Sequence, residues 1–199
     1  MKHPLQHAWT LWYYEPDRNK SWEDNQNQVS TFTSVEDFWS LFTHIKQPSE
    51  VKIGSDYSLF KESIRPMWED KANKNGGRWM LTLSRNQRPE LDRYWIDTVL
   101  CLIGEAFDSF DDICGAVVNI RSKGDKIGKL IDIVLCTLIN KIFFVAVWTS
   151  NSNNKDSVME IGRKLKEGLN LPERLKIQYQ THSDSMVKNS SNVKSLYEI

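Results

Sequence analysis

The chain has 199 residues and a mass of 23.2 kDa, the size of a single domain that can bury roughly 70% of its unfolded surface without disulfides or metals. Its 26 Lys and Arg residues balance its 26 Asp and Glu residues. This balance excludes a protein that coats nucleic acid through bulk positive charge. The N-terminus has no apolar stretch typical of a signal peptide. Three cysteines in apolar runs, without metal-ligand spacing, predict free buried thiols in a reducing compartment: Cys101, Cys114 and Cys136.

The first half of the chain contains two predicted strands and two predicted helices. A strand is expected over 8–14, and a helix begins with a capping box at Thr33 and Glu36. The apolar face of this helix consists of Val35, Phe38, Trp39, Phe42 and Ile45. A strand over 78–83 follows the Gly76-Gly77 turn, and a helix runs from about Leu91 to about Phe107.

The second half continues with strands over 113–121, up to Trp148, and over 175–180, and with a helix from about Asp156 to Gly168. Three helices separated by several strands with hairpin-like turns predict an α+β fold. Its sheet should be largely antiparallel. One face of the sheet would pack on the helices, and the other would be open to a ligand.

No motif in the sequence is typical of an active site. His3 and His7 are four residues apart, but Pro4 lies between them, which argues against a helical metal pair. The acidic cluster at 108–112 is expected in a solvated turn, and there is no glycine-rich phosphate loop. We therefore expect a binding protein that needs neither a metal nor a cofactor, rather than an enzyme.

Two of the eight tryptophans lie in polar segments. Trp22 is surrounded by charged and amide side chains, and Trp68 lies between Pro66-Met67 and the acidic pair Glu69-Asp70. One interpretation is that each ring folds back over the edge of the core. The other is that the two rings stack on a planar ligand, as aromatic side chains stack on bases in proteins that bind single-stranded RNA. Four further tryptophans fit strand or helix periods, which predicts core or interface positions: Trp9, Trp39, Trp79 and Trp95.

Basic residues near the end of the strand over 113–121 could receive phosphate groups, since Arg and Lys donate charge-assisted hydrogen bonds. They are Arg121, Lys123 and Lys126, together with Arg78 and, near the C-terminus, Lys188. The alternative is a solvated turn. The carboxylate of Glu69 could accept two parallel hydrogen bonds from the Watson–Crick edge of guanine. Alkylation at N7 would make that base cationic and add a cation–π contribution of about 0.5–2 kcal/mol per indole ring.

Longer motifs carry a resemblance to a known family. They are Asp56-Tyr57-Ser58-Leu59-Phe60-Lys61, Pro66-Met67-Trp68-Glu69-Asp70, Gly76-Gly77-Arg78-Trp79, Cys101-Leu102-Ile103-Gly104-Glu105, and Cys114-Gly115-Ala116-Val117-Val118-Asn119-Ile120-Arg121. With Trp22, they resemble the eukaryotic translation initiation factor 4E family, and insect members in particular. The resemblance runs from His3 to the C-terminus with one interruption. It implies a curved antiparallel sheet backed by three helices, with the 7-methylguanosine cap of mRNA in a slot on the concave face.

The resemblance also implies a role for each matching residue in the slot. Trp22 and Trp68 would sandwich the methylated guanine, Glu69 would bind its N1 and N2 edge, and Trp148 would contact the N7 methyl group. The phosphate bridge would be held by Arg121 and Lys126, with support from Arg78, Asn119 and Lys123.

On the convex face, the resemblance implies a dock for a helical Tyr-x4-Leu-apolar motif carried by scaffold and repressor proteins. The matching residues are His3, Pro4, Val35, Trp39, Ile96, Leu100 and Gly104. Ser191 aligns with a regulated phosphorylation site, although Ser190 replaces the glycine usual before it.

The interruption consists of residues 128–145. The family pattern is close to Lys-Ile-Ala-Ile-Trp, whereas here Lys126-Ile127 are separated by eighteen residues from Ala146-Val147-Trp148. Codons for 128–129 and 145–146 can contain a splice donor GT and an acceptor AG, so one hypothesis is an unspliced intron; coding DNA without them would refute it. The alternative is a lineage-specific loop. In one form of it Lys141-Ile142 begin the strand, and Lys141 takes the phosphate role of Lys126.

The function implied by the resemblance is cap binding and partner recruitment in translation initiation, in the cytoplasm and also in the nucleus. Two alternatives remain. The chain could dock partners but bind the cap weakly because of residues 128–145, or it could be a cytosolic carrier of a small aromatic ligand. Binding of a triphosphate would weaken as salt rises, whereas binding of a neutral aromatic ligand would not.

Overall fold

The computed structural model describes residues 1–122, 141–187 and 195–199. Its strands are β1 (Pro4–Tyr14), β2 (Gln26–Ser34), β3 (Asp56–Lys61), β4 (Gly77–Ser84), β5 (Ile113–Ser122), β6 (Lys141–Thr149), β7 (Ile177–Thr181) and β8 (Tyr197–Glu198). Its α-helices are α1 (Val35–Phe42), α2 (Arg88–Ile103), α4 (Lys155–Gly168) and α5 (His182–Val187). Within the described ranges, the strands form one sheet in the order β2-β1-β3-β5-β6-β4-β7-β8, and every neighbouring pair is antiparallel.

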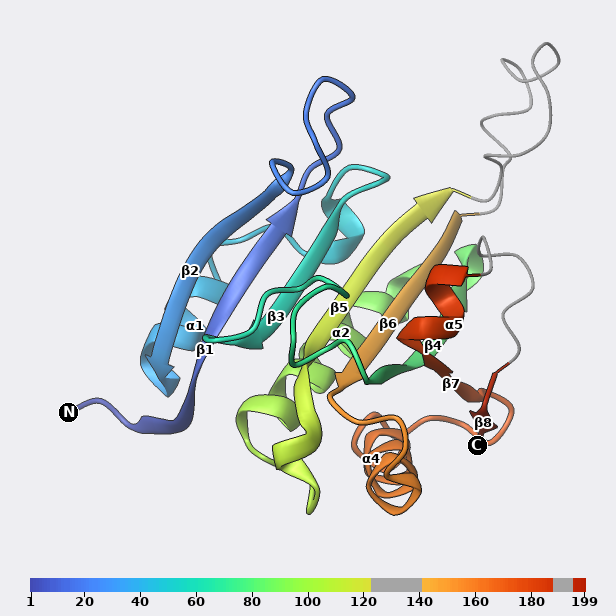
Figure 1. Cartoon of the computed structure of the whole chain (residues 1–199). Helices are drawn as coiled ribbons and strands as arrows, with labels where there is room; N and C mark the ends of the chain where they lie inside the picture. The colour runs from blue at the N-terminus through green and yellow to red at the C-terminus, as the bar shows by residue number, and fades with distance from the viewer. Residues whose placement is uncertain (123–140, 188–194) are drawn as a thin grey trace, which may run out of the picture.

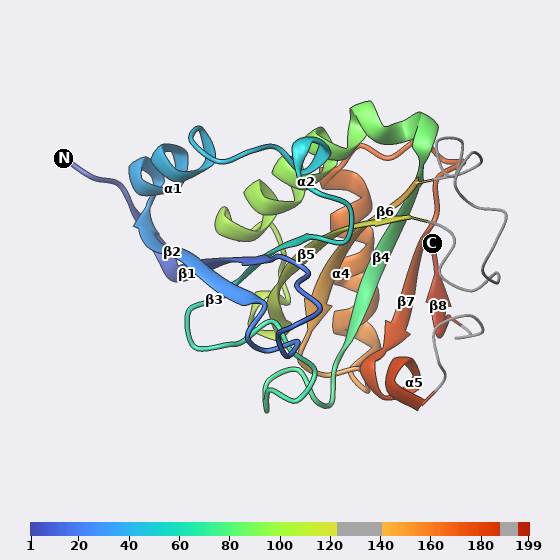
Figure 2. The ribbon, with the colours of Figure 1, turned by 90° about the horizontal axis from the view of Figure 1, so that it is seen from above.

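The sheet is curved, and the helices are divided between its two sides. Figure 1 shows the strands side by side, and Figure 2 shows α1, α2 and α4 on the convex side. The short helix α5 and the loops after β1 and β3 lie on the concave side. The predicted α+β fold, with its largely antiparallel sheet, is confirmed. The predicted helices correspond to α1, α2 and α4, whereas α5 was not predicted.

Alternation along the strands divides the apolar side chains between two layers. In β4, Trp79, Leu81 and Leu83 are fully buried under the helices, while the residues between them face the other side. The indole Nε1 of Trp79 donates a hydrogen bond of 2.7 Å to the carbonyl of Val158 in α4. Beside it, Gly162 allows close approach, since a Cβ there would lie 2.5 Å from the Trp79 ring. The main core is therefore tightly packed between the sheet and α4.

Two predicted helix boundaries were wrong. The N-cap of α1 is Ser34 rather than Thr33, because the Ser34 hydroxyl accepts from the backbone N–H of Asp37. The helix predicted to reach Phe107 ends at Ile103, where the chain turns through Gly104 and through Glu105 at φ 52°. Both corrections are local. Of the predicted apolar face of α1, Phe38 and Phe42 are buried, whereas Val35 and Trp39 are exposed.

Strand β6 includes part of the segment that interrupts the family pattern. It begins at Lys141, which pairs with Ser122 of β5, and Phe144 pairs with Asn119. Residues 128–140 lie outside the described part of the chain. Residues 141–145 complete the strand that leads into Ala146-Val147-Trp148, so Phe144 stands where the family pattern has its lysine.

Candidate nucleotide-binding site

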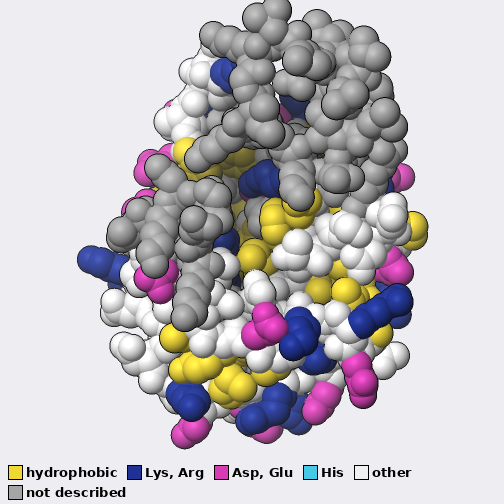
Figure 3. Space-filling model, turned by 90° about the vertical axis from the view of Figure 1, so that its right-hand side faces the viewer, with side chains coloured by type: hydrophobic (Ala, Val, Ile, Leu, Met, Phe, Trp, Pro, Cys, Tyr) yellow, Lys and Arg dark blue, Asp and Glu magenta, His cyan; other side chains and the backbone are white. Residues whose placement is uncertain are grey.

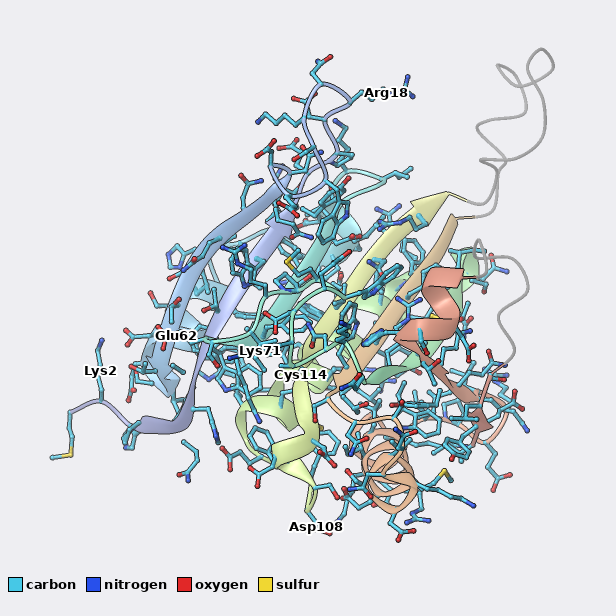
Figure 4. The ribbon with its side chains drawn as sticks, viewed as in Figure 1. Lys2, Arg18, Glu62, Lys71, Asp108 and Cys114 are labelled. Carbon is cyan, nitrogen blue, oxygen red and sulfur yellow. The ribbon has the colours of Figure 1, made fainter. Side chains whose placement is uncertain are left out.

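A second, smaller apolar cluster lies on the concave face of the sheet. Its buried members are Phe60, Cys114, Val117, Ala146 and Trp148, and the loop after β3 packs on it through Ile64, Trp68 and Ala72. Burial raises the pKa of the Cys114 thiol to about 12, so the thiol stays protonated and inert. The Cys114 Sγ donates a hydrogen bond to the Ala72 carbonyl of this loop at 3.6 Å, and Figure 4 labels Cys114 on β5.

Side-chain hydrogen bonds within the loop fix its path over the sheet. The amide of Asn73, which is fully buried, donates to the carbonyls of Arg65 and Met67 at 2.9 and 2.8 Å. The carboxylate of Asp70 accepts from the backbone N–H groups of Arg65 and Ala72. These bonds hold the segment that carries Trp68 without help from regular secondary structure.

Trp68 and Trp148 meet at a buried histidine, His182, the first residue of α5. Its ring centroid lies 6.5 Å from that of Trp68, with an interplanar angle of 24°, and 4.2 Å from that of Trp148. His182 is fully buried, and neither ring nitrogen has a hydrogen-bond partner among the described residues. Burial, with a smaller contribution from the charge of Arg78, lowers the pKa of His182 to about 3. The ring is therefore neutral at physiological pH.

Trp22 lies on the loop between β1 and β2, whose tip carries Arg18 (Figure 4). Its side chain is 46% exposed and stands 6.2 Å from the Tyr14 ring. A cavity of about 150 Å³ opens beside it and is lined by Trp12, Trp22, Glu23, Gln26, Arg65, Pro66 and Met67. Trp68 is not among the residues that line this cavity, and its ring is instead stacked with that of His182. Trp22 and the two residues before Trp68, Pro66 and Met67, therefore line the same cavity, but the Trp22 and Trp68 rings are not in contact.

The next group along the concave face is an ion pair. Arg121 donates two hydrogen bonds to Asp56, from Nη1 to Oδ1 at 2.5 Å and from Nη2 to Oδ2 at 2.8 Å. Asp56 is buried, so the pair fixes the guanidinium over β3. Arg78 approaches from β4. Its pKa is lowered by burial and by the charge of Arg121, and its Nε has no partner among the described residues.

The structure brings together some of the predicted site residues and leaves others apart. Trp68, Trp148 and Arg78 surround His182, whereas Arg121 and Asn119 lie further along β5. Glu69 is exposed next to Trp68. Four predicted residues lie outside the described part of the chain: Lys123, Lys126, Lys188 and Ser191.

Three residues of the site were not predicted as functional residues: His182, Asp56 and Phe144. Asp56 begins a motif that the resemblance used, and an acidic residue that begins a buried strand is a usable signal. His182, a single histidine between two polar residues, gives no signal in the sequence that it belongs to the site. The position of Phe144 depends on how β6 pairs with β5.

Four of the predicted partner-binding residues lie on helices of the convex side (Figure 2): Val35 and Trp39 on α1, and Ile96 and Leu100 on α2. Val35 and Trp39 on α1 and Leu100 on α2 are exposed apolar side chains, with Trp39 at 44% exposure. The backbone N–H of Val35 donates to the His3 carbonyl at 3.0 Å, which ties the start of β1 to α1. Ile96 is half-buried, and Pro4 and Gly104 are exposed.

Charged side chains of both signs occur together on the face of the molecule drawn in Figure 3. Figure 3 looks at the edge that carries β7 and β8, and basic, acidic and apolar side chains are interspersed there. The part of the chain that the structure describes contains no group of three or more His, Cys, Asp or Glu residues able to hold a metal ion. Nor does any of its helices have the length and apolar character that crossing a membrane requires.

Comparisons with known proteins agree with the fold and with the predicted family. Residues 4–196 match the family described as Eukaryotic initiation factor 4E. A Drosophila melanogaster relative, eukaryotic translation initiation factor 4E1, is 54% identical over 198 residues, which cover 100% of this chain and 70% of the relative. The Homo sapiens eukaryotic translation initiation factor 4E is 47% identical over 201 residues, covering 100% of this chain and 84% of the relative.

Solved structures with the same fold include complexes with cap compounds and with a 4E-binding protein. Ascaris suum eIF4E-3 with the m2,2,7G cap has a TM-score of 0.84 and 42% identity, and covers 100% of this chain and 99% of that one. C. elegans eIF4E-3 with the 4E-binding protein Mextli and a cap analog has a TM-score of 0.84 and 40% identity, and covers 100% of both chains. The chain belongs to the Eukaryotic initiation factor 4E family. The resemblance seen in the sequence, including the similarity to insect members, is confirmed.

Proposed function

We propose that this chain binds the 7-methylguanosine cap of mRNA and recruits scaffold and repressor proteins in translation initiation. It acts as a binding protein and not as a catalyst, in the cytoplasm and also in the nucleus. Membership of the family supports this proposal, as do related structures named as complexes with caps and with 4E-binding proteins. The observation that carries it is the gathering of tryptophans and guanidinium groups on one concave face.

The methylated base would be clasped between Trp22 and Trp68. The cavity beside Trp22 provides one wall, and Trp68 reaches the other side of the base by leaving the His182 ring. Glu69 is exposed and free to accept hydrogen bonds from N1 and N2, and Trp148 would contact the N7 methyl group. A cationic base between indole faces gains a cation–π contribution of about 0.5–2 kcal/mol per ring.

The phosphate bridge would extend along β5 towards Arg121. Asp56 holds that guanidinium in place, and the remaining N–H groups of the guanidinium would bind the anion. Arg78 and Asn119 support the bridge from the neighbouring positions. Lys123, Lys126 and Lys188 keep their proposed phosphate roles.

On the convex side, an amphipathic Tyr-x4-Leu-apolar helix would lie across α1 and α2. The exposed apolar side chains of Val35, Trp39 and Leu100 give such a helix an apolar surface, which requires no net charge on the protein. His3, Pro4, Ile96 and Gly104 border it. Phosphorylation of Ser191 would add negative charge three residues after Lys188 in the sequence.

Fluorescence titration of the whole chain tests the proposal. The expected result is that 7-methylguanosine triphosphate quenches the tryptophan emission in a saturable way and binds at least about tenfold more tightly than GTP, since the methylated base carries the cation–π contribution. Equal affinity for the two nucleotides would contradict the assignment of the slot. Binding that is independent of salt would instead favour the carrier of a neutral aromatic ligand.

One observation favours the alternative in which partners dock normally but the cap binds weakly. Phe144, and not a lysine, stands opposite Asn119 at the phosphate end of the slot.

A further inference from the structure

Alternation along β6 places Phe144 on the ligand face of the sheet. Phe143, Val145 and Val147 belong to the main core under the helices, whereas Ala146 and Trp148 belong to the concave cluster. Phe144 lies two residues before Ala146 and is only partly buried. Since side chains two residues apart share a face, the Phe144 ring is on the same side as Trp148.

The strand register places this ring in one row with the Arg121 ion pair. Asp56 of β3 is opposite Asn119 of β5, and Asn119 is opposite Phe144 of β6. Arg121 reaches back into this row to bind Asp56. Neighbouring strands are about 4.8 Å apart, so the ring lies roughly two strand spacings from the carboxylate that holds the guanidinium.

Among the described residues of this row, the net charge is therefore small. The positive charge of Arg121 is already paired with buried Asp56, Asn119 is neutral, and a phenyl ring cannot donate a hydrogen bond to a phosphate. We propose that Phe144 is a specificity-determining residue of this site. It places a ring instead of a cation at this position of β6, so affinity rises less with each added phosphate than it would with lysine at the same position. This inference rests on the proposed cap-binding function and adds to it a preference for phosphate number that is weaker than lysine at position 144 would give.

Calorimetric titration with 7-methylguanosine monophosphate and triphosphate tests the inference, using the whole chain and three variants. Phe144→Lys restores a cation, whose stem can lie along the apolar face while its ammonium group reaches the ligand. Phe144→Leu changes the ring without adding charge. Val29→Lys adds the same charge at an exposed position on β2, four strands away from β6.

We expect Phe144→Lys to raise the ratio of triphosphate to monophosphate affinity about tenfold, the effect of one charge-assisted contact in partial exposure to solvent. Its affinity for the triphosphate should also fall more steeply with salt than that of wild type, because salt screens the added charge. Phe144→Leu and Val29→Lys should keep the wild-type ratio. Thr82→Lys, at the exposed β4 position paired with Phe144, should raise the ratio by a smaller factor.

A ratio that stays within about twofold of wild type in both Phe144→Lys and Thr82→Lys would overturn the inference. The Thr82 variant keeps this test decisive if Phe144→Lys fails to fold, which urea denaturation would reveal. Failure of the wild-type chain and every variant to bind either compound would refute the proposed function, and this inference with it. Binding with unchanged ratios would refute the inference alone.

Discussion

The fully buried His182 makes the stability of the fold depend on pH. The pKa of its ring falls from an ordinary value of 6.5 to about 3, because burial and then the charge of Arg78 disfavour the protonated form. Below pH 6.5 the unfolded chain therefore binds a proton that the folded chain refuses. Stability is unaffected by this group above that pH and falls as the pH decreases below it.

The size of the loss follows from the shift. Each pH unit between the two pKa values costs about 1.4 kcal/mol, so at about pH 4.5 the loss approaches 3 kcal/mol. This is a large part of the roughly 5–15 kcal/mol that stabilises a typical domain. His182→Gln removes the titrating group and should remove this part of the pH dependence, whatever its own cost in packing.

Urea unfolding of wild type and His182→Gln near pH 7.5 and near pH 4.5 measures this effect. The stability that each protein loses between the two pH values is determined, and the loss in His182→Gln is subtracted from the loss in wild type. Carboxylates that also titrate, such as Glu36, Asp37 and Glu198, are common to both proteins and cancel. The same substitution at the exposed His44 controls for loss of a surface histidine. If wild type and His182→Gln lose the same stability on acidification, within about 0.5 kcal/mol, the reasoning is wrong.

Three further variants test other parts of the molecule. Trp68→Ala should weaken binding of 7-methylguanosine triphosphate by about 1–3 kcal/mol, because one stacking ring is lost; calorimetry measures this, and unchanged affinity would exclude Trp68 from the slot. Trp39→Ala should weaken binding of a Tyr-x4-Leu-apolar peptide by about 2 kcal/mol or more, since tryptophans often dominate the binding energy of such contacts. Its affinity for the cap should stay the same. A peptide affinity equal to wild type would place the partner-binding surface elsewhere. Gly162→Ala should lower the free energy of unfolding, measured in urea, by about 1–3 kcal/mol, because its Cβ would lie 2.5 Å from the Trp79 ring. This clash should outweigh the better helix propensity of alanine. A gain in stability would contradict the close packing of α4.

Segments whose apolar residues recur with a clear helical or strand period were predictable from the sequence. The predicted positions of α1, α2, α4, β4 and β5 follow from apolar residues at helical or alternating spacing. Three strands were missed, namely β2, β3 and the two-residue β8, the first two for opposite reasons. Edge strand β2 is mostly polar, with the sequence Gln-Asn-Gln-Val-Ser-Thr-Phe-Thr-Ser, and β3 is buried on both faces, so it shows no alternation.

For the site, the family resemblance provided the roles of Trp22, Trp68 and Glu69 but not their arrangement. The Trp68 ring lies on His182, a contact between residues more than a hundred positions apart that no local pattern encodes. The same holds for Phe144. Its place opposite Asn119 depends on the pairing of β6 with β5 and not on its neighbours in the sequence.

The most direct test of cap binding in the concave slot is a crystal structure of the chain with 7-methylguanosine triphosphate. The base should lie between Trp22 and Trp68, with the Trp68 ring moved off His182, Glu69 at the N1 and N2 edge, and the phosphates directed towards Arg121. A base bound outside this slot, or a Trp68 ring that still lies on His182 when the nucleotide is bound, would contradict the proposed mode of binding.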